Sequence, residues 1–395
     1  MHFANNKSYT EQGIHMHSGS KVVDLDSEAK EITVETAEGK EQFAYDKLLL
    51  SPGGFAPVPP FEGVDLDHVH TFRGPEDTQA VYERMSETKN LVVIGSGYIG
   101  VEVATAYAEA GINVTVIDMI DRLLPVYLDK DISTILEEHG QTKGLAFKGG
   151  EAVQKLEGKD GKVSAVVTDK GEYPADTVIV AVGVKPDTKW LNDRLDINER
   201  GFIVTNEYLE TSAKDVYAGG DATYIPFAPT DTMTNVGLAT LARRQGVVAA
   251  LNAMGEKREM PQVSGTSALR YFDYTIAATG ISSVNADTYS GNVASKYVEE
   301  KVYPDFMRKP GTVHMTIFYD EDTHVILGGQ LVSTVDVADS INVLSLAINA
   351  KYTLEQLALL DTFFQPNFDR PWHYLNVLAI EALGNNVSGH DKLLF

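Results

Sequence analysis

The fold is decided by residues 91–118, which read LVVIGSGYIGVEVATAYAEAGINVTVID. The run LVVI is typical of a buried parallel strand, and the glycines after it indicate a tight turn. Apolar residues then recur at helical spacing until Gly111 ends the helix: Ile99, Val103, Ala106 and Ala110. A second apolar strand, Asn113–Ile117, follows. The stretch therefore predicts strand, glycine turn, helix and strand, the repeating unit of a doubly wound α/β sheet.

The glycine turn has the spacing of a dinucleotide fingerprint. Gly95 permits the tight turn, Gly97 lets a pyrophosphate approach the backbone, and Gly100 lets helix and strand pack closely. Asp118 lies 23 residues after Gly95, near the spacing of about 20 at which an acid binds the adenosine ribose. This carboxylate would repel a 2′-phosphate and favour NADH over NADPH. The alternative is a glycine turn that only packs a helix on a sheet, but the agreement of strand, helix, second strand and acid favours dinucleotide binding.

Composition limits the class of protein. The chain has 395 residues, which suggests two or three domains at about 150 residues each. It carries 33 Lys and Arg against 56 Asp and Glu, a net charge of −23, so we expect neither a sequence-independent nucleic-acid binder nor docking on an anionic membrane. No apolar run reaches the roughly 18 residues of a membrane span, and the first residues lack the apolar core of a signal peptide.

Cysteine is absent from the chain. The sequence therefore holds no disulfide, thiolate metal ligand, iron–sulfur ligand or cysteine nucleophile, and it fits a reducing, cytoplasmic compartment. Two histidine pairs, His15 with His17 and His68 with His70, share strand faces. Without cysteine or an HExxH motif we expect these histidines to be solvated strand residues, and we expect no metal site.

The remaining elements are predicted from their patterns. Residues 1–50 alternate as strands or hairpins, 51–65 form a Pro- and Gly-rich connection, and 75–88 form a polar helix. A meander is expected in 151–182, a strand in 214–221, a helix in 235–253, a hairpin in 314–333, and helices in 336–351 and 370–383. Residues 45–54 and 175–184 share an aspartate, an apolar run and a glycine turn, which two related nucleotide units or two ordinary buried strands explain equally well.

Several stretches together resemble the NADH oxidase and NADH peroxidase family, flavoproteins of the pyridine nucleotide–disulfide oxidoreductase class. They are VVIGSGYIGVE, VTVIDMIDRLLPVYLDKD, VIVAVGVKPDT, DVYAGGDAT, LATLARRQG, ILGGQLVS and FFQPNFDRPWHYLN. The resemblance implies an α/β fold of doubly wound nucleotide-binding domains with an α+β C-terminal dimerisation domain. It implies an FAD-domain portion in 1–74, an NADH domain in 75–190, a return to the FAD domain in 191–260 and a dimerisation domain in 261–395. The implied cofactors are FAD and NADH, the second substrate is O2 or H2O2, and the assembly is a homodimer.

The resemblance also implies roles for particular residues. For NADH it implies Gly95, Gly97, Ile99 and Gly100 at the pyrophosphate, Asp118 at the ribose, Tyr127 near the adenine end and Gly183 along the nicotinamide half. Tyr98 resembles a tyrosine that lies over the flavin and moves when nicotinamide enters. For FAD it implies Ser51, Gly53, Arg73, Asp221, and the helix start at Leu238, Ala239 and Thr240. Phe364, Pro366 and Phe368 are implied near the partner's flavin, and an apolar subunit interface explains them equally well.

Two family features have no counterpart in the sequence. The family's first strand, glycine turn and helix, and its redox cysteine with a nearby histidine, are not found. We therefore expect an N-terminally shortened member with an incomplete FAD domain, weak FAD binding, impaired activity and no assignable catalytic residue.

Three functions follow as hypotheses. The first is a flavin-dependent NADH oxidase or peroxidase whose residual activity, without cysteine, yields hydrogen peroxide. The second is a non-catalytic, dimeric NADH-binding module. The third, a simple NAD-dependent dehydrogenase, lacks a recognisable His/Asp or Tyr/Lys catalytic set.

Overall fold

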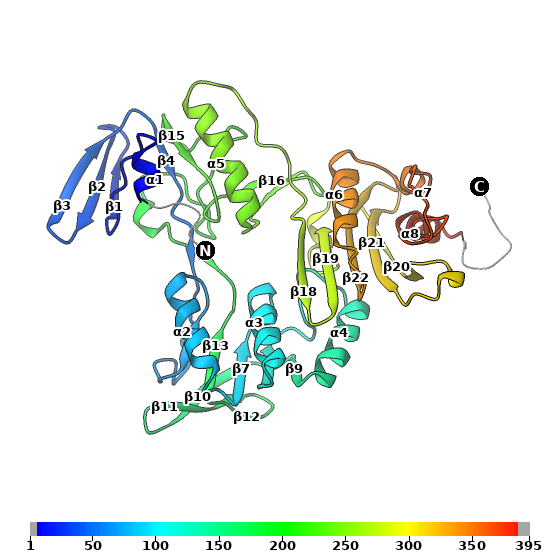
Figure 1. Cartoon of the computed structure of the whole chain (residues 1–395). Coiled ribbons are helices and arrows are strands. Elements are labelled where there is room, and N and C mark those ends of the chain that lie inside the picture. The colour runs from blue at the N-terminus through cyan, green and yellow to red at the C-terminus, as the bar shows by residue number, and fades with distance from the viewer. Residues whose placement is uncertain (1–5, 386–395) are drawn as a thin grey trace. The chain divides into compact units, whose positions relative to one another are not determined.

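The computed structural model describes residues 6–385, which fold into two compact units (Figure 1). Of the described residues, unit 1 combines 6–54, Lys185–Ile225 and Thr234–Pro261. Unit 2 combines Phe55–Val184, Pro226–Met233 and 262–385. The four-domain division stays a prediction, and its first five and last ten residues, 1–5 and 386–395, lie outside the described residues.

Unit 1 joins segments that are far apart in the sequence. The strand β4 (Leu48–Leu50) pairs in parallel with β15 (Val216–Ala218), and helix α5 (Ala239–Ala253) packs on both. Branched apolar side chains from β4, β15 and η1 (Lys189–Leu191) contribute to its core, including Leu50, Val216 and Leu191. Unit 1 also contains α1 (Asn6–Thr10) and the antiparallel strands β1 (Lys21–Asp26), β2 (Glu31–Thr36) and β3 (Gly39–Ala44).

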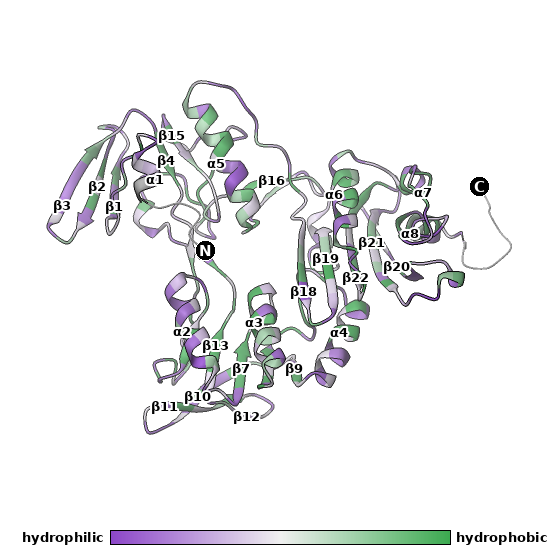
Figure 2. Ribbon diagram, viewed as in Figure 1, coloured by the Kyte–Doolittle hydropathy of each residue, from purple (hydrophilic) through white to green (hydrophobic). Residues whose placement is uncertain are grey.

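Unit 2 contains a five-stranded parallel sheet of order β6-β13-β7-β8-β9. Its strands are β6 (Val69–Thr71), β13 (Thr177–Val180), β7 (Asn90–Ile94), β8 (Asn113–Asp118) and β9 (Leu145–Gly149). Strand β7 is green and helix α2 is largely purple in Figure 2, and four of the five residues of β7 are buried, as expected for a strand covered on both faces. The helices of this part are α2 (Pro75–Met85), α3 (Tyr98–Glu109) and α4 (Lys130–Thr142).

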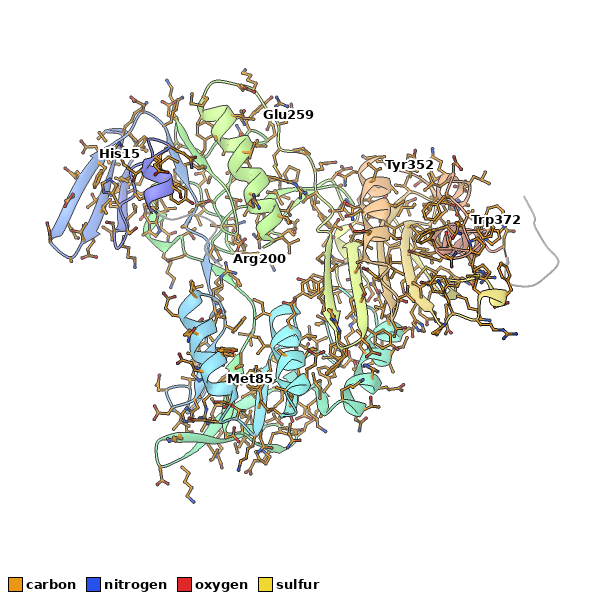
Figure 3. The ribbon with its side chains drawn as sticks, in the orientation of Figure 1. His15, Met85, Arg200, Glu259, Tyr352 and Trp372 are labelled. Carbon is orange, nitrogen blue, oxygen red and sulfur yellow. The ribbon has the colours of Figure 1, made fainter. Side chains whose placement is uncertain are left out.

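The core of this sheet follows from its sequence. Val93, Val116 and Ile179 point into a cluster with Val101 and Ala104 of α3. Met85, labelled in Figure 3, ends α2 and packs against the same cluster. The opposite face is covered by the predicted meander, the antiparallel strands β10 (Val153–Lys159), β11 (Lys162–Thr168) and β12 (Glu172–Pro174).

The second sheet of unit 2 is antiparallel, with strand order β18-β19-β22-β21-β20. The predicted hairpin is β21 (Thr312–Asp320) with β22 (Ile326–Ser333), and every residue of β22 is buried. Trp372, labelled in Figure 3, packs against the core of this sheet and its helices. The other elements are β18 (Ser267–Tyr271), β19 (Tyr274–Gly280), β20 (Val293–Lys301), α6 (Ile341–Asn349), α7 (Leu354–Ala358), α8 (Tyr374–Ala382), η2 (Ala286–Thr288), η3 (Asp305–Met307) and η4 (Ala338–Ser340).

The predicted fold class, doubly wound α/β domains with an α+β C-terminal domain, is confirmed. Helix α4 was not predicted, although Ile132 and Leu136 lie four residues apart and are both fully buried. Two short pairs, β5 (Gly54–Phe55) with β14 (Lys185–Pro186) and β16 (Ile225–Phe227) with β17 (Thr232–Thr234), complete the structure. In residues 6–385 no helix has the length and apolar character needed to span a bilayer.

Candidate nucleotide-binding sites

The glycine turn after β7 needs glycine for two different reasons. Gly95 has a φ of 108°, and a Cβ there would overlap the carbonyl oxygen of Ala181. A Cβ on Gly100 would overlap the carbonyl oxygen of Gly95, so helix α3 lies against the turn. Gly97 differs, because a Cβ on it would have no heavy atom within 4 Å. The turn is therefore closely packed on one side and open at Gly97.

Helix α3 begins beside this opening. Gly97 is its N-cap, no side chain caps it, and Val101 N–H donates to the Gly97 carbonyl at 2.9 Å. The N–H groups of Tyr98, Ile99 and Gly100 come before the first helical hydrogen bond, so helix geometry gives them no partner within the helix. Together with the helix dipole they form an anion-binding end. This arrangement suits a pyrophosphate despite the negative net charge of the chain.

Asp118 lies at the end of β8, directly beside the turn. Its Oδ2 accepts hydrogen bonds from Ser96 N–H and from Ser96 Oγ, each at 2.7 Å, and its Oδ1 accepts one from Ile120 N–H at 2.9 Å. A carboxylate offers about four acceptor positions, so these three bonds leave room for a ribose hydroxyl. The half-buried carboxylate thus orients the turn and can still receive a sugar.

Tyr98 and Tyr127 form a stacked pair. Their ring centroids lie 3.7 Å apart with an interplanar angle of 7°. Burial raises the pKa of both phenols, so both stay neutral. Tyr127 is partly buried and packs against the core of unit 2, and its predicted place near the adenine stays a prediction.

Gly183 lies beyond the end of β13, at the same sheet edge. It has a φ of 105°, and a Cβ there would have no heavy atom within 4 Å. Since β13 pairs with β7, this second open glycine lies near the Gly95 turn. The structure of unit 2 thus brings together the glycines, Asp118 and the tyrosine pair, and these residues fit NADH.

In unit 1 a second site is built at the ends of two parallel strands. Ser51 follows β4, and Gly219, Gly220 and Asp221 follow β15. Ser51 Oγ donates to the Gly219 carbonyl at 2.9 Å, which ties the two strand ends together. Nucleotides bind outside the carboxyl ends of such strands.

The turn at Gly220 is held from helix α5. Gly220 has a φ of 88°, and its N–H donates to the buried side chain of Gln245. Asn235 Nδ2 donates to the Asp221 carbonyl at 3.1 Å. A Cβ on Gly237 would lie 3.7 Å from the Asp221 carboxylate, so Asp221 faces the chain that leads into α5.

Helix α5 begins at Ala239 after the N-cap Leu238, with no side-chain cap. The predicted helix start at Leu238, Ala239 and Thr240 is therefore present, and its N–H groups form a second anion-binding end. Gly53 has a φ of 66°, and a Cβ there would have no heavy atom within 4 Å. Ser51, Gly53, Asp221 and the α5 start lie in one unit and fit the phosphate and sugar parts of a flavin nucleotide.

Arg73 is placed differently from the other predicted FAD residues. It lies in unit 2, in the turn between β6 and α2, where its N–H donates to Asp77 Oδ2 at 2.9 Å. Its role toward FAD stays a prediction.

Sequence reasoning missed residues that support both sites. Ser96 sits inside the glycine motif, and its small polar side chain between two glycines was a usable signal. Gln245 lies within a predicted helix, but no local pattern marked it. Ser267 and Gln330, which contact the tyrosine pair and its loop, lie far from them in the sequence.

Comparison with known proteins identifies the family of this chain. The family model for pyridine nucleotide-disulphide oxidoreductases matches residues 3–246. The chain belongs to this family. The model for the family's dimerisation domain matches residues 266–374, which include the antiparallel sheet with helices α6 and α7.

Relatives extend over nearly the whole chain. An NADH oxidase of Enterococcus faecalis is 36% identical over 386 residues, covering 97% of this chain and 86% of the relative. A coenzyme A polysulfide/persulfide reductase of Pyrococcus horikoshii is 33% identical, covering 93% and 82%. The structure of a water-forming NADH oxidase from Lactobacillus brevis bound to NADH has a TM-score of 0.93 at 34% identity, covering 97% and 85%.

These findings confirm the predicted membership of the NADH oxidase group and an oxidoreductase that uses FAD and a pyridine nucleotide. They do not test the individual residue roles, which stay predictions. They give no support to the expected N-terminal shortening, weak FAD binding and impaired activity.

Proposed function

We propose that the protein is an NADH oxidase, taking hydride from NADH onto FAD and passing the electrons to O2. The assignment of NADH rests on the Asp118 carboxylate, which accepts two hydrogen bonds from Ser96 next to the uncapped start of α3. The relatives named NADH oxidase support O2 as the electron acceptor.

The residues of unit 2 would bind and orient NADH. The first N–H groups of α3 would donate to the pyrophosphate, and the open glycines Gly97 and Gly183 would let the nucleotide lie against the backbone. Asp118 would accept from the adenosine ribose. A 2′-phosphate at that place would meet the carboxylate as a like charge, so NADH would be preferred to NADPH.

The residues of unit 1 would hold FAD. Asp221 would accept hydrogen bonds from its sugar-like chain, while the start of α5 would present positive dipole to the flavin nucleotide. When bound, FAD supplies the chemistry, by accepting a hydride and returning electrons to oxygen. The protein's contribution is to bind and orient the reactants.

We propose hydrogen peroxide as the product. The 395 residues contain no cysteine, so no thiol of this chain can form the sulfenic acid that peroxide reduction through sulfur requires. The balanced reaction is NADH + H⁺ + O2 → NAD⁺ + H2O2, in which NADH is oxidised by two electrons and oxygen is reduced by two.

We propose that two copies pair through the C-terminal domain. Large apolar side chains are exposed there, among them Leu346 at 71%, Phe363 at 68%, Phe368 at 66% and Leu359 at 61%. Exposed apolar patches of this kind mark association surfaces, and the dimerisation-domain model covers these residues. Light scattering coupled to size-exclusion chromatography should give twice the 43.1 kDa chain mass.

The test of activity uses the purified chain with added FAD. NADH oxidation is monitored by the loss of NADH absorbance. We expect it to consume O2 and to release one H2O2 per NADH. NADH binding without turnover would show the non-catalytic binding module instead. Turnover that requires added H2O2 would show a peroxidase, and oxygen uptake without peroxide release would contradict the proposed product.

A further inference from the structure

Methionine supplies all the oxidisable sulfur atoms of this chain. The sequence contains nine methionines and no cysteine. Peroxide oxidises a thioether to a sulfoxide, and a side chain that is open to solvent reacts before a buried one. The exposed methionines are therefore the sulfur sites on which H2O2, the proposed product, can act.

The methionine side chains differ widely in exposure. Met254 is 85% exposed and Met119 is 76% exposed. Met16 and Met233 are exposed to a smaller extent, whereas Met315 is fully buried. Since peroxide must reach the sulfur atom, Met254 and Met119 should react first and Met315 last.

Met119 differs from the other exposed methionines because it directly follows Asp118, the last residue of β8. The backbone is held on both sides of it. The Asp118 carbonyl accepts a hydrogen bond from Glu151 N–H at 2.9 Å, and the Ile120 carbonyl accepts one from Gly150 N–H at 3.2 Å. Ile120 N–H also donates to Asp118 Oδ1 at 2.9 Å. The backbone of Met119 is thus fixed beside the carboxylate, while its side chain is largely open to solvent.

This position places the Met119 thioether within reach of the adenosine half of NADH. In the proposed site, Asp118 accepts hydrogen bonds from the adenosine ribose. The Cα atoms of consecutive residues lie about 3.8 Å apart, and a methionine side chain is long and flexible. Contact between a thioether and an aromatic ring is favourable. Adenosine bound on Asp118 would therefore cover the Met119 side chain with a gain in affinity.

Oxidation of this thioether would remove the gain. The sulfur atom attacks one peroxide oxygen, an S–O bond forms, the O–O bond breaks and the other oxygen leaves as water: thioether + H2O2 → sulfoxide + H2O. Sulfur loses two electrons and peroxide accepts them. The sulfoxide is polar, so covering it with adenosine would cost the desolvation of its oxygen.

We propose that Met119 is a site of oxidation by H2O2 and that its sulfoxide weakens the binding of NADH, so that accumulated product slows the reaction. This inference rests on the proposed function, which supplies both the peroxide and the NADH site. It assigns a product-sensitive residue to a chain that has no thiol.

The test treats the full chain with H2O2 in the absence of NADH and then removes the peroxide by gel filtration. Peptide mass spectrometry gives the sulfoxide fraction at each methionine, and isothermal titration gives the NADH affinity. Adding H2O2 directly makes the result independent of whether turnover releases peroxide.

Two variants identify the residue responsible. Met119→Leu keeps an apolar side chain of similar size that peroxide does not oxidise. Met254→Leu is the matched control, because Met254 is also highly exposed but lies at the C-cap of α5, the opposite end from the proposed FAD-binding start.

We expect wild type and Met254→Leu to lose NADH affinity by about three- to tenfold once Met119 is oxidised. Met119→Leu should stay within about twofold of its own untreated affinity after the same treatment. Unchanged affinity of wild type with Met119 oxidised would overturn the inference. An equal loss in Met119→Leu would overturn it too, as would a Met119 that stays unoxidised while Met254 reacts. An untreated wild-type chain that does not bind NADH would instead overturn the proposed function.

Discussion

Asp118 binds both the backbone N–H and the hydroxyl of Ser96 through a single carboxylate oxygen, at 2.7 Å each. Asp118 therefore has a structural role without bound nucleotide, because it fixes the glycine turn. Its other oxygen accepts a hydrogen bond from Ile120 N–H. One residue thus links the shape of the turn to the recognition of a ribose.

Asp118→Ala should lower NADH affinity by about ten- to hundredfold, the usual effect of losing hydrogen bonds to a charged group. It should also narrow the preference for NADH over NADPH, because the repulsion of a 2′-phosphate is removed. Titration with both nucleotides measures this. Asp176→Ala is the matched control, since Asp176 accepts backbone N–H bonds from Lys89 and Asn90 at the opposite strand ends. It should lose stability and keep its nucleotide preference; a shifted preference there would contradict the assignment of Asp118.

Gly97→Ala and Gly100→Ala should fail in different ways. Gly97 has a φ of −71° and open space at its Cβ position, so alanine should leave the melting temperature near wild type and obstruct the pyrophosphate. Gly100→Ala places a methyl group against the Gly95 carbonyl, so it should cost about 1–3 kcal/mol of stability. Thermal melts with NADH titration separate the two results. Normal NADH binding by Gly97→Ala would show that the pyrophosphate does not dock there.

Asp221→Asn should lower FAD affinity by about tenfold, because a neutral amide accepts weaker hydrogen bonds than a carboxylate. The bound-flavin absorbance after dialysis measures the effect. Asp215→Asn serves as the control, since Asp215 is occupied by Lys30 and Lys47, which hold the pKa of its carboxyl at about 2. Equal flavin loss in both variants would indicate a general disturbance of unit 1 rather than a contact with FAD.

A buried acid and base in the C-terminal domain predict a pH effect. Asp369 is 2% exposed, and its Oδ2 lies 3.8 Å from His373 Nε2. Burial raises the pKa of Asp369 from 3.8 to about 6 and lowers the pKa of His373 from 6.5 to about 4. Between pH 3.8 and about 6 the folded state holds the Asp369 proton that the unfolded chain releases, so the free energy of unfolding falls as pH rises. Between about pH 4 and 6.5 the unfolded chain binds a proton at His373 that the folded state does not, so His373 makes the free energy of unfolding rise with pH. The two pH dependences therefore oppose each other.

Asp369→Asn should therefore remove the pH dependence of stability that comes from Asp369 and leave the one that comes from His373. Relative to wild type, the variant should gain stability from pH 4 to pH 6.5, by up to about 3 kcal/mol for two pKa units. Melting temperatures across this range give the difference. Asp287→Asn changes an exposed carboxylate of the same domain, and its melting temperature should vary with pH as that of wild type does. The same pH dependence in Asp369→Asn as in wild type would contradict the raised pKa of Asp369.

Local patterns predicted the parts of the site that lie on single elements. The strand, the Gly95–Gly100 turn, the helix and Asp118 follow one another within 28 residues, so periodicity and turn chemistry define them. The hairpin of β21 and β22 was likewise found from its alternating and apolar runs. Helix α4 was missed, although its apolar spacing was present. Its N-cap residue Asp129 accepts a hydrogen bond from Gln330 and makes no side-chain cap.

The rest depends on contacts that no window of sequence contains. Unit 1 pairs β4 with β15, and Ser51 with Gly219, across 168 positions. Ser267 reaches Tyr98 across 169 positions, and Gln330 reaches Asp129 across 201. Such contacts are set by how domains pack, and a serine or glutamine on a strand has no distinctive local pattern. Tertiary structure was needed to show that the C-terminal sheet contacts the tyrosine pair.

The central claim is that NADH docks its pyrophosphate on the start of α3 with Asp118 on the adenosine ribose. A crystal structure of the chain with NADH tests it most directly. We predict phosphate oxygens within hydrogen-bond distance of the Tyr98 and Ile99 N–H groups, and a ribose hydroxyl within that distance of Asp118. A nucleotide bound elsewhere, or a side chain filling the space beside Gly97 while Asp118 faces away from the sugar, would contradict it.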